Sequence, residues 1–340
     1  MESTRITAHW LRVLRIKRVF RSIQRVYYPL LAAVSVPVNL MTIAILSRGK
    51  CGLSTCVTRY LVAMAAADLM LVILDLMLRH IPIVYWQEFS FVQSFPVCKV
   101  HAALLFAATD CSVWFTVTFT FDRFVSICCL DFKIKYCTER TAAMVLWTVA
   151  ALSCCKNVFW YFMLTGRYLL TNLPWFCGVA GSVRTSRVWA AVEFSHYILT
   201  PGIPFVLILL FNAFSVRHIV AASRARWRLR GQGRGACGQT TRDPEMENRR
   251  KSIILLLVIS GNFILLWSLF IIYAVCYRIS TLGLVTVDVN IFVEQIGFML
   301  QLLSCCTNTG IYAVTQTKYR AEVKRAVKYP LDAIVRFVSR

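Results

Sequence analysis

Long apolar blocks are the feature of this 340-residue sequence that most limits how it can fold. We identify seven of them, at residues 26–47, 57–80, 98–130, 141–164, 189–221, 251–277 and 290–315, separated by short polar or basic segments. The apolar core of a bilayer is about 30 Å thick, so a helix rising about 1.5 Å per residue crosses it with about 20 residues. The sequence therefore predicts an all-α membrane protein with a bundle of seven transmembrane helices in residues 26–315.

The composition supports a membrane protein and argues against several functions. Hydrophobic residues make up 58% of the chain and charged residues 16%, whereas soluble domains contain about 45–50% apolar and about 25% charged residues. The sequence has no zinc-protease signature, no glycine-rich phosphate loop and no Ser/His/Asp arrangement, so we do not expect an enzyme or a cofactor. A transporter or channel is the alternative from another class, but the repeat symmetry typical of transporters is not visible.

The net charge of +22 is concentrated in alternate connections between the blocks. The stretch 217–251 carries ten Lys and Arg residues, and the tail after Thr315 carries seven. Because cytosolic segments of membrane proteins are enriched in Lys and Arg, we expect the C-terminus and a loop at about 222–250 in the cytosol, and the N-terminus outside the cell. These basic residues border membrane spans, which argues against nucleic acid as a partner.

Both ends of the chain are basic and amphipathic. Residues 1–25 form a basic segment that conflicts with an extracellular N-terminus; it is either a helix on the membrane surface or the result of a natural start elsewhere. Residues 316–340 predict an amphipathic helix and short tail that contact membrane lipid.

Two of the 14 cysteines are expected on the outer face of the membrane. Cys98 begins the third block, and Cys177 lies between the fourth and fifth. Disulfides persist in oxidising compartments, whereas cytosolic thiols stay reduced. A Cys98–Cys177 disulfide would tie this outer loop to the top of the third helix.

Charged residues inside the blocks are candidates for function, because a charge at the centre of a membrane helix costs about 2.5–3.5 kcal/mol on insertion scales. Asp68 lies in the middle of the second block, and Asp122 and Arg123 lie at the cytosolic end of the third. Further ionisable residues occupy the middles or outer halves of the blocks, namely Asp75, Asp110, Glu193, His196 and Glu294.

A series of motifs in order and register resembles the rhodopsin-like (class A) G-protein-coupled receptors. The motif residues are Asn39 in "PVNL", Asp68 in "AAADL", Cys98, Arg123 in "DRF", Trp147, Pro204, Phe263 and Trp267 in "FILLW", Asn308 and Tyr312 in "NTGIY", and Tyr319. Longer stretches such as "VYYPLLAAVSVPVNL" and "DPEMENRRKSIILL" resemble the orphan receptors named probable G-protein coupled receptor 139 and their relatives. The resemblance implies a plasma-membrane receptor that binds an extracellular ligand and promotes nucleotide exchange on a heterotrimeric G protein.

The resemblance also implies roles for individual residues. Arg123 would be held by Asp122 in the inactive receptor and released toward the G protein on activation. The switch residues Phe263, Trp267, Asn308 and Tyr312 would connect the ligand to that change. Three departures leave open a receptor-like protein that does not signal. Leu269 and Thr309 stand where the family carries the prolines that bend the sixth and seventh helices, and Arg249 stands where the sixth helix of the family often carries an acid.

The family's sodium site has counterparts here. The resemblance implies that Asp68, Ser112, Ser304 and Asn308 would hold an allosteric sodium ion, for which oxygen ligands are suited. Cys305 places a sulfur where the family carries a serine oxygen, which weakens the expected site. The alternative is a hydrogen-bonded polar contact between helices without an ion.

The ligand pocket is expected in the outer half of the bundle. Leu105 occupies the position where amine receptors carry Asp, which argues against a biogenic amine. Thr109 follows it one turn later on the same face. We propose a contact between Asp110 and His196; a bond from Asp110 to backbone or to a hydroxyl is the alternative. The candidate pocket residues are Asp75, His101, Leu105, Thr109, Glu193, His196, Tyr273 and Glu294, which suit a small aromatic molecule or a short peptide.

Overall fold

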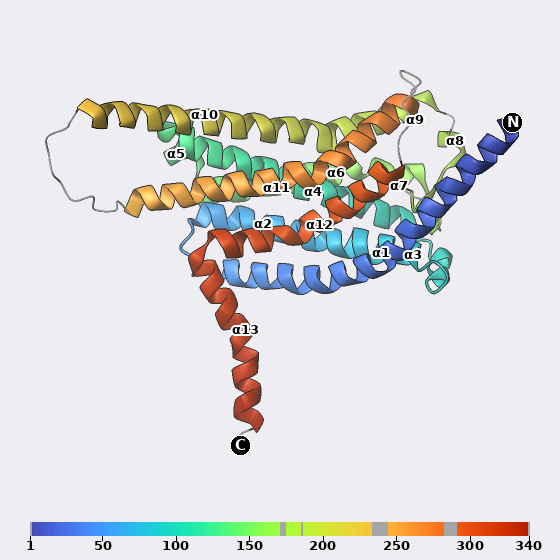
Figure 1. Ribbon diagram of the computed structural model, residues 1–340, viewed down its shortest axis with the longest axis horizontal. Coiled ribbons are helices and arrows are strands. Elements are labelled where there is room, and N and C mark those ends of the chain that lie inside the picture. Colours follow the sequence, from blue (N-terminus) through green and yellow to red (C-terminus); the bar gives the residue numbers. More distant parts are fainter. Residues whose placement is uncertain (1, 171–174, 185, 233–243, 282–290, 339–340) are drawn as a thin grey trace.

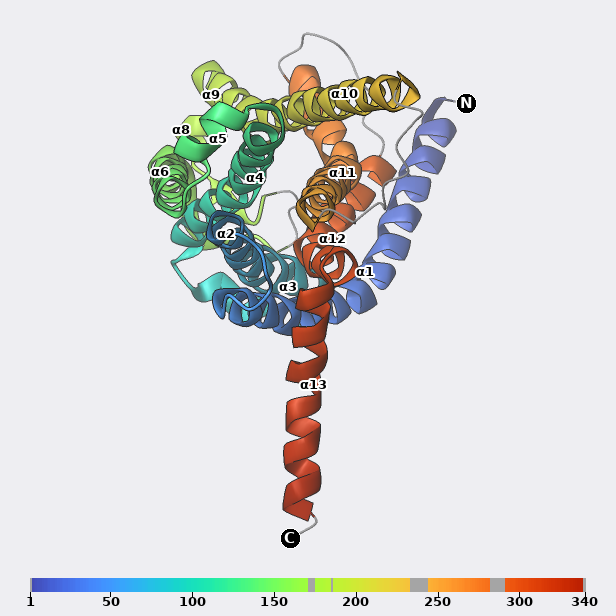
Figure 2. The same cartoon turned by 90° about the vertical axis from the view of Figure 1, so that its left-hand side faces the viewer.

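The computed structural model describes residues 2–170, 175–184, 186–232, 244–281 and 291–338. Six helical stretches are long and apolar enough to cross a membrane, at Val13–Ser47, Thr55–Val84, Cys98–Cys128, Glu139–Met163, Ala191–Arg224 and Ile253–Tyr277. Helix α12 (Ile291–Thr315) packs between α1 (Glu2–Ser47) and α11 (Pro244–Thr281) as the seventh member of the bundle. The predicted fold class, a seven-helix bundle followed by a C-terminal helix, is confirmed (Figures 1 and 2).

The remaining elements complete these spans or connect them. The second span comprises α2 (Thr55–Leu71), η1 (Val72–His80) and α3 (Ile81–Val84), and the third is α4 (Cys98–Cys128). The fourth span comprises α6 (Glu139–Asn157) and α7 (Phe159–Met163). The fifth comprises α9 (Arg187–Tyr197), η3 (Ile198–Gly202) and α10 (Ile203–Gln232). Short connections contain η2 (Ser90–Ser94), α5 (Leu130–Tyr136) and α8 (Gly181–Arg184). The strands β1 (Leu164–Tyr168) and β2 (Cys177–Val179) form an antiparallel hairpin.

Local sequence explains where several helices begin. Ser54 and Thr138 precede α2 and α6, and each side chain accepts a hydrogen bond from a backbone N–H of the first turn. The connection from α1 to α2 turns at Gly49 and Gly52, whose φ angles of 67° and 68° favour glycine. These signals place the first helix pair antiparallel with a tight connection.

Two spans contain π-helical segments, which change the faces that their side chains present. The segment η1 brings Asp75, Arg79 and His80 into the bundle, where all three are buried. The segment η3 contains Thr200, whose φ of −151° and ψ of 113° interrupt the helix before Pro201. A π-helix closes its hydrogen bonds at i→i+5, so helical periodicity of 3.6 residues does not predict which residues point inward.

The two ends of the chain extend away from the bundle. Residues 2–25 continue the first span as one helix, α1, whose N-terminal part projects beyond the other helices (Figure 1). Helix α13 (Thr317–Val338) leaves the opposite end of the bundle and points sideways, across the direction of the spans (Figures 1 and 2). An amphipathic helix in that direction can lie along a membrane surface.

Candidate functional site

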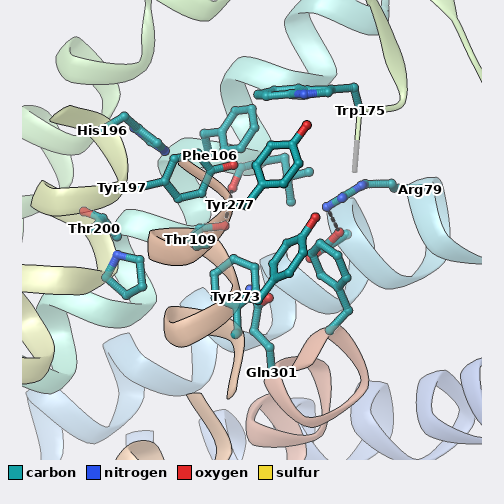
Figure 3. A pocket seen from close by; sticks show the side chains of 16 residues that line it. Arg79, Phe106, Thr109, Trp175, His196, Tyr197, Thr200, Tyr273, Tyr277 and Gln301 are labelled. Carbon is teal, nitrogen blue, oxygen red and sulfur yellow. Dashed lines mark hydrogen bonds and ion pairs between the residues drawn. The ribbon is translucent and has the colours of Figure 1, made fainter. Parts of the chain in front are cut away.

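A cavity lies at the end of the bundle near the hairpin, and Figure 3 shows the side chains that line it. The cavity volume is about 60 Å³, and the empty space that also includes its opening to solvent is about 700 Å³. The lining is rich in aromatic rings and consists of Asp75, Arg79, Leu105, Phe106, Thr109, Trp175, His196, Tyr197, Thr200, Pro201, Phe270, Tyr273, Ala274, Tyr277, Phe298 and Gln301. An apolar cavity with a few convergent polar groups is the usual form of a small-molecule site.

Five of the eight predicted pocket residues line this cavity: Asp75, Leu105, Thr109, His196 and Tyr273. The other three, His101, Glu193 and Glu294, are not part of the lining. Glu193 is buried, and the carboxyl of Glu294 interacts with the hydroxyl of Tyr273. Glu294 can therefore affect the cavity through Tyr273.

An ion pair that the sequence analysis missed stands at the wall of the cavity. Arg79 Nη1 lies 2.7 Å from Asp75 Oδ1, and both side chains are buried. The guanidinium also lies over the rings of Phe176 and Phe298, at 5.3 and 5.7 Å from their centroids. The spacing of four residues between Asp75 and Arg79 could have predicted this ion pair. Arg79 was passed over because it stands next to the end of the predicted span, where a charge is ordinarily solvated.

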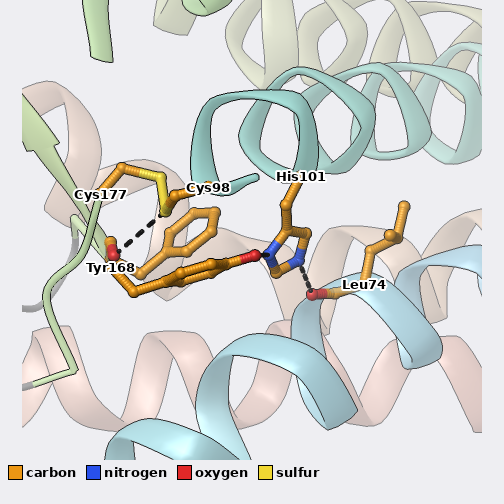
Figure 4. Close-up of a disulfide and its surroundings, with 6 residues drawn as sticks. Leu74, Cys98, His101, Tyr168 and Cys177 are labelled. Atoms are coloured by element: carbon orange, nitrogen blue, oxygen red, sulfur yellow. Dashed lines mark hydrogen bonds between the residues drawn. A yellow bond between two sulfur atoms is a disulfide. The ribbon is translucent and has the colours of Figure 1, made fainter. Parts of the chain in front are cut away.

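His101 supports the outer loop. Its Nε2 donates to the Leu74 carbonyl at 2.7 Å, so Nδ1 can accept from the Tyr168 hydroxyl at 3.3 Å (Figure 4). Burial raises the pKa of Tyr168 above its usual value, so the phenol stays protonated at neutral pH. His101 thus joins the second span, the third span and the hairpin.

The predicted Cys98–Cys177 disulfide is confirmed (Figure 4). It joins the first residue of α4 to the first residue of β2, with Cα atoms 5.8 Å apart. The neighbouring residues Trp175 and Phe176 reach the cavity wall and the ring of His101. The disulfide therefore fixes the segment that covers part of the cavity.

Asp110 has partners other than the predicted His196. Lys156 Nζ lies 2.7 Å from Asp110 Oδ2, and the Asn157 amide donates to the same oxygen at 2.6 Å. Lys156 also donates to the Thr200 hydroxyl at 3.2 Å, while His196 packs against aromatic rings that include Phe106. The prediction overlooked the only lysine of the fourth span; a lysine inside a membrane segment normally has a partner.

Trp267 connects the cavity with the seventh span. Its ring packs edge-on against Phe270, which lines the cavity, and stacks on Phe263, with centroids 5.9 and 5.2 Å away. Its Nε1–H donates to the Ser304 hydroxyl at 3.0 Å. A change at Phe270 can therefore reach α12 through Trp267.

Three of the four predicted sodium-site residues meet in the middle of the bundle. Ser112 Oγ donates to Asp68 Oδ1 and Asn308 Nδ2 donates to Asp68 Oδ2, both at 2.8 Å. Ser304 binds Trp267 and the Gln301 carbonyl instead. Among the residues described, Asp68 has only these neutral hydrogen-bond partners, so the buried carboxylate lacks a protein cation. A charge-neutralising ion with oxygen ligands fits this position.

At the other end of α4 from the disulfide, Asp122 and Arg123 form a buried ion pair through Asp122 Oδ2. Arg123 Nε donates to the same oxygen at 3.0 Å, and the Cys56 thiol donates to Oδ1 at 3.2 Å. The Cys137 thiol lies 3.6 Å from the Asp122 carbonyl. The Asp122 carboxylate is thus held by Arg123 and by Cys56 of α2, and the Asp122 backbone contacts Cys137 in the connection to α6.

Tyr312 and Tyr319, near the end of the seventh span, differ in the hydrogen bonds of their hydroxyl groups. Their rings lie 6.0 Å apart. The Tyr319 hydroxyl lies 2.9 Å from Thr42 Oγ1, which lies 2.6 Å from Thr309 Oγ1. The buried hydroxyl of Tyr312 has no hydrogen-bond partner in the described part of the chain. Thr309, which stands at the family's proline position, therefore joins α12 to α1 by a hydroxyl contact.

Two comparisons with known proteins match most of this chain. The family described as "7 transmembrane receptor (rhodopsin family)" matches residues 38–312. The "Compound eye opsin BCRH2" of Hemigrapsus sanguineus is 23% identical to this chain over 323 residues, which cover 93% of this chain and 81% of the opsin. The family match includes Asn39, Asp68, Arg123, Trp267 and Tyr312.

Proposed function

This chain belongs to the rhodopsin family of seven-transmembrane receptors, and we propose that a small extracellular ligand in its outer cavity promotes nucleotide exchange on a heterotrimeric G protein. The family signals through G proteins and is not a family of enzymes, and the chain is a multi-pass membrane protein.

The observation that carries the proposal is the path of contacts from the cavity to the seventh span. Phe270 lines the cavity and packs on Trp267, and Trp267 donates to Ser304. Asn308 lies one turn along α12 from Ser304 and bonds Asp68. A ligand that displaces Phe270 would change the position of α12 relative to α2 and α4.

At the cytosolic end of the bundle, Arg123 would be the group that the G protein meets. In this structure its guanidinium is paired with Asp122, an arrangement that we assign to the closed receptor. A buried ion pair is stable only while both partners stay together, so opening of this end requires a new partner for Arg123. A G-protein segment would supply it, which makes the pair a switch rather than a source of stability.

The positive-inside bias supports a plasma-membrane receptor with its N-terminus outside and its C-terminus in the cytosol. The cavity then opens toward the extracellular side and Arg123 faces the cytosol. The basic segments on both sides of residues 233–243, which lie outside the described part of the chain, would extend toward the G protein.

The cavity chemistry supports a small aromatic ligand with polar groups, or the end of a short peptide. Tyr197, Tyr273, Tyr277 and Trp175 supply rings, and the Asp75–Arg79 pair supplies both charges (Figure 3). Leu105 supplies no counter-charge for a simple amine at its position. The resemblance of the sequence to probable G-protein coupled receptor 139 and relatives agrees with this ligand class.

Asp68 would be the centre of an allosteric sodium site. Asp68 and Ser112 would hold the ion, and Ser304 would contribute only after giving up its bond with Trp267. The ion would supply the positive charge that Asp68 lacks.

A panel of G-protein dissociation assays in cells tests the proposal, with small aromatic molecules and short peptides as probes. We expect one G-protein class to respond in the wild type and Arg123→Ala to abolish the response at matched surface expression. Equal signals in wild type and R123A would contradict it. A receptor-like protein that does not signal is the second candidate, favoured by Thr309 and Leu269 at the proline positions, and it predicts no response with either chain.

A further inference from the structure

The connection between α3 and α4, residues 85–97, exposes a cluster of phenyl rings. Phe91 and Phe95 are 57% and 49% exposed. The ring of Phe91 stacks on Phe89 with centroids 6.0 Å apart and meets Phe95 edge-on at 6.1 Å. Phe91 thus packs on both of the other rings, and two of the three rings are exposed side by side, an apolar patch that soluble surfaces rarely leave in water.

This aromatic cluster is continuous with the surface that the bundle presents to lipid. Val97 follows it directly, and Val100 and Leu104 continue the exposed apolar stripe along α4. Leu104 also lines an apolar groove between α2, α4 and α6, together with Met70, Ala107 and Trp147. Because α2, α4 and α6 belong to membrane spans, the groove and the stripe face acyl chains.

Two contacts place the connection at the outer boundary of the membrane. At its start, the Tyr85 hydroxyl donates to the Arg25 carbonyl at 2.6 Å, next to the residue where the first apolar block begins. Just past its end, Lys99 Nζ lies 4.5 Å from the centroid of Tyr161, near the end of the fourth span. The connection therefore ends beside the end of the fourth span, and it begins beside the start of the apolar block that the sequence predicts at residues 26–47.

The connection also extends sideways. It lies at the end of the bundle near the N-terminus (Figure 1), and it projects outside the ring of helices next to α2 (Figure 2). An element in this position lies over lipid rather than over the cavity.

We propose that residues 85–97 are a membrane-interface anchor, in which Phe91 and Phe95 insert into the outer leaflet at the boundary between headgroups and acyl chains. Phe side chains on interfacial segments insert into the boundary between headgroups and acyl chains. Lys99 and the exposed Arg167 lie beside the same end of α4 and suit lipid phosphates. Lipid is the partner that continuity with the membrane surface supports; a protein partner is an outcome that the test separates.

The anchor has a structural connection to the cavity. A Cβ at residue 166 would lie 3.1 Å from the Pro96 carbonyl oxygen, so the connection packs directly against β1. The same hairpin carries Tyr168 and the disulfide of Cys177. Insertion of Phe91 and Phe95 would therefore fix the height of the hairpin above the membrane.

Photocrosslinking of the full chain in phosphatidylcholine nanodiscs tests the anchor. The photoreactive residue p-benzoylphenylalanine is placed at position 91, at Val100 as a lipid-facing reference, and at Glu88 as an exposed control in the same connection. After irradiation, lipid adducts are measured by intact mass. We expect position 91 to give an adduct yield similar to position 100 and at least threefold above position 88.

Two results would overturn the anchor. One is an adduct yield at position 91 no higher than at position 88. The other is a crosslink from position 91 to a protein, in place of lipid, when the same variants are irradiated in cells. Neither readout depends on a ligand or on G-protein signalling, so failure of the anchor and failure of the proposed function are distinguishable.

Discussion

Lys156 and Asp110 form an ion pair that joins the fourth span to the third, with Nζ 2.7 Å from Oδ2 and the carboxylate only 2% exposed. Together with Asn157 and Thr200, the pair connects three helical elements behind the cavity wall. Neither residue lines the cavity, so the pair supports its wall from outside.

Replacement of Lys156 by Met should strongly destabilise the receptor, because Asp110 would remain buried without its cation. Breaking a buried pair costs about 3–5 kcal/mol, whereas the double variant K156M/D110N removes both charges and should recover part of the loss. The thermal midpoint in detergent micelles measures both effects. Glu139→Gln is the matched control, because the Arg59–Glu139 pair is 58% and 47% exposed and is worth about 0–1 kcal/mol. A K156M midpoint equal to that of E139Q would refute the assignment.

The two tyrosines near the end of the seventh span provide a matched pair of substitutions. Tyr319→Phe removes a hydroxyl that bonds Thr42 and should cost about 1 kcal/mol. Tyr312→Phe removes a buried hydroxyl without a partner in the described chain, so it should leave the stability of the unliganded receptor unchanged. Thermal unfolding of both variants tests this difference, and equal destabilisation would argue against the Thr42–Tyr319 bond.

Asp122→Asn should raise basal signalling, because a neutral amide holds Arg123 less tightly than the carboxylate does. A loss of about 1 kcal/mol from the closed state would increase the open population about fivefold. Ligand-free G-protein dissociation at matched surface expression is the measurement. Glu322→Gln, which weakens the exposed Arg325–Glu322 pair on α13, should leave the basal signal unchanged. Unchanged basal signalling in D122N would show that this pair does not hold the receptor closed.

Sodium should stabilise the wild type, and removal of the Asp68 carboxylate should abolish the effect. At a sodium concentration about 100 times the dissociation constant, binding adds about 2.7 kcal/mol. The thermal midpoint is compared between sodium chloride and choline chloride at equal ionic strength, for wild type, Asp68→Asn and the exposed control Asp131→Asn. A sodium response that persists in D68N would place the ion elsewhere.

The elements that could be predicted from the sequence are those marked by local residue patterns or by the length and apolarity that a membrane span requires. Apolar blocks of this length predict the spans, because a helix satisfies its backbone hydrogen bonds within its own segment and can therefore cross lipid. The Cys98–Cys177 disulfide followed from the expected topology, which placed both residues at the outer face, and the structure contains the bond. The resemblance to the receptor family placed Asn308 and Ser112 beside Asp68, and both hydrogen bonds are present in the structure.

The parts that sequence reasoning missed depend on irregular backbone or on packing between helices. The π-helical segment η1 determines how Asp75 and Arg79 face the cavity, and no period in the sequence marks it. Lys156 was missed because its partner is 46 positions away on another helix. His101 and Glu294 lie on the helices that surround the cavity but do not line it. His101 faces Tyr168 of the hairpin, and Glu294 faces Tyr273.

The disulfide between Cys98 and Cys177, with a sequence separation of 79, makes the intervening chain a covalent ring that contains all of α4 and α6. A single backbone cut in the connection near α5 would open that ring without releasing either piece. The nicked receptor would migrate as one molecule under non-reducing conditions and as two fragments after reduction. The third and fourth spans can therefore stay together, and the outer hairpin can keep its place, after proteolysis on the opposite side of the membrane.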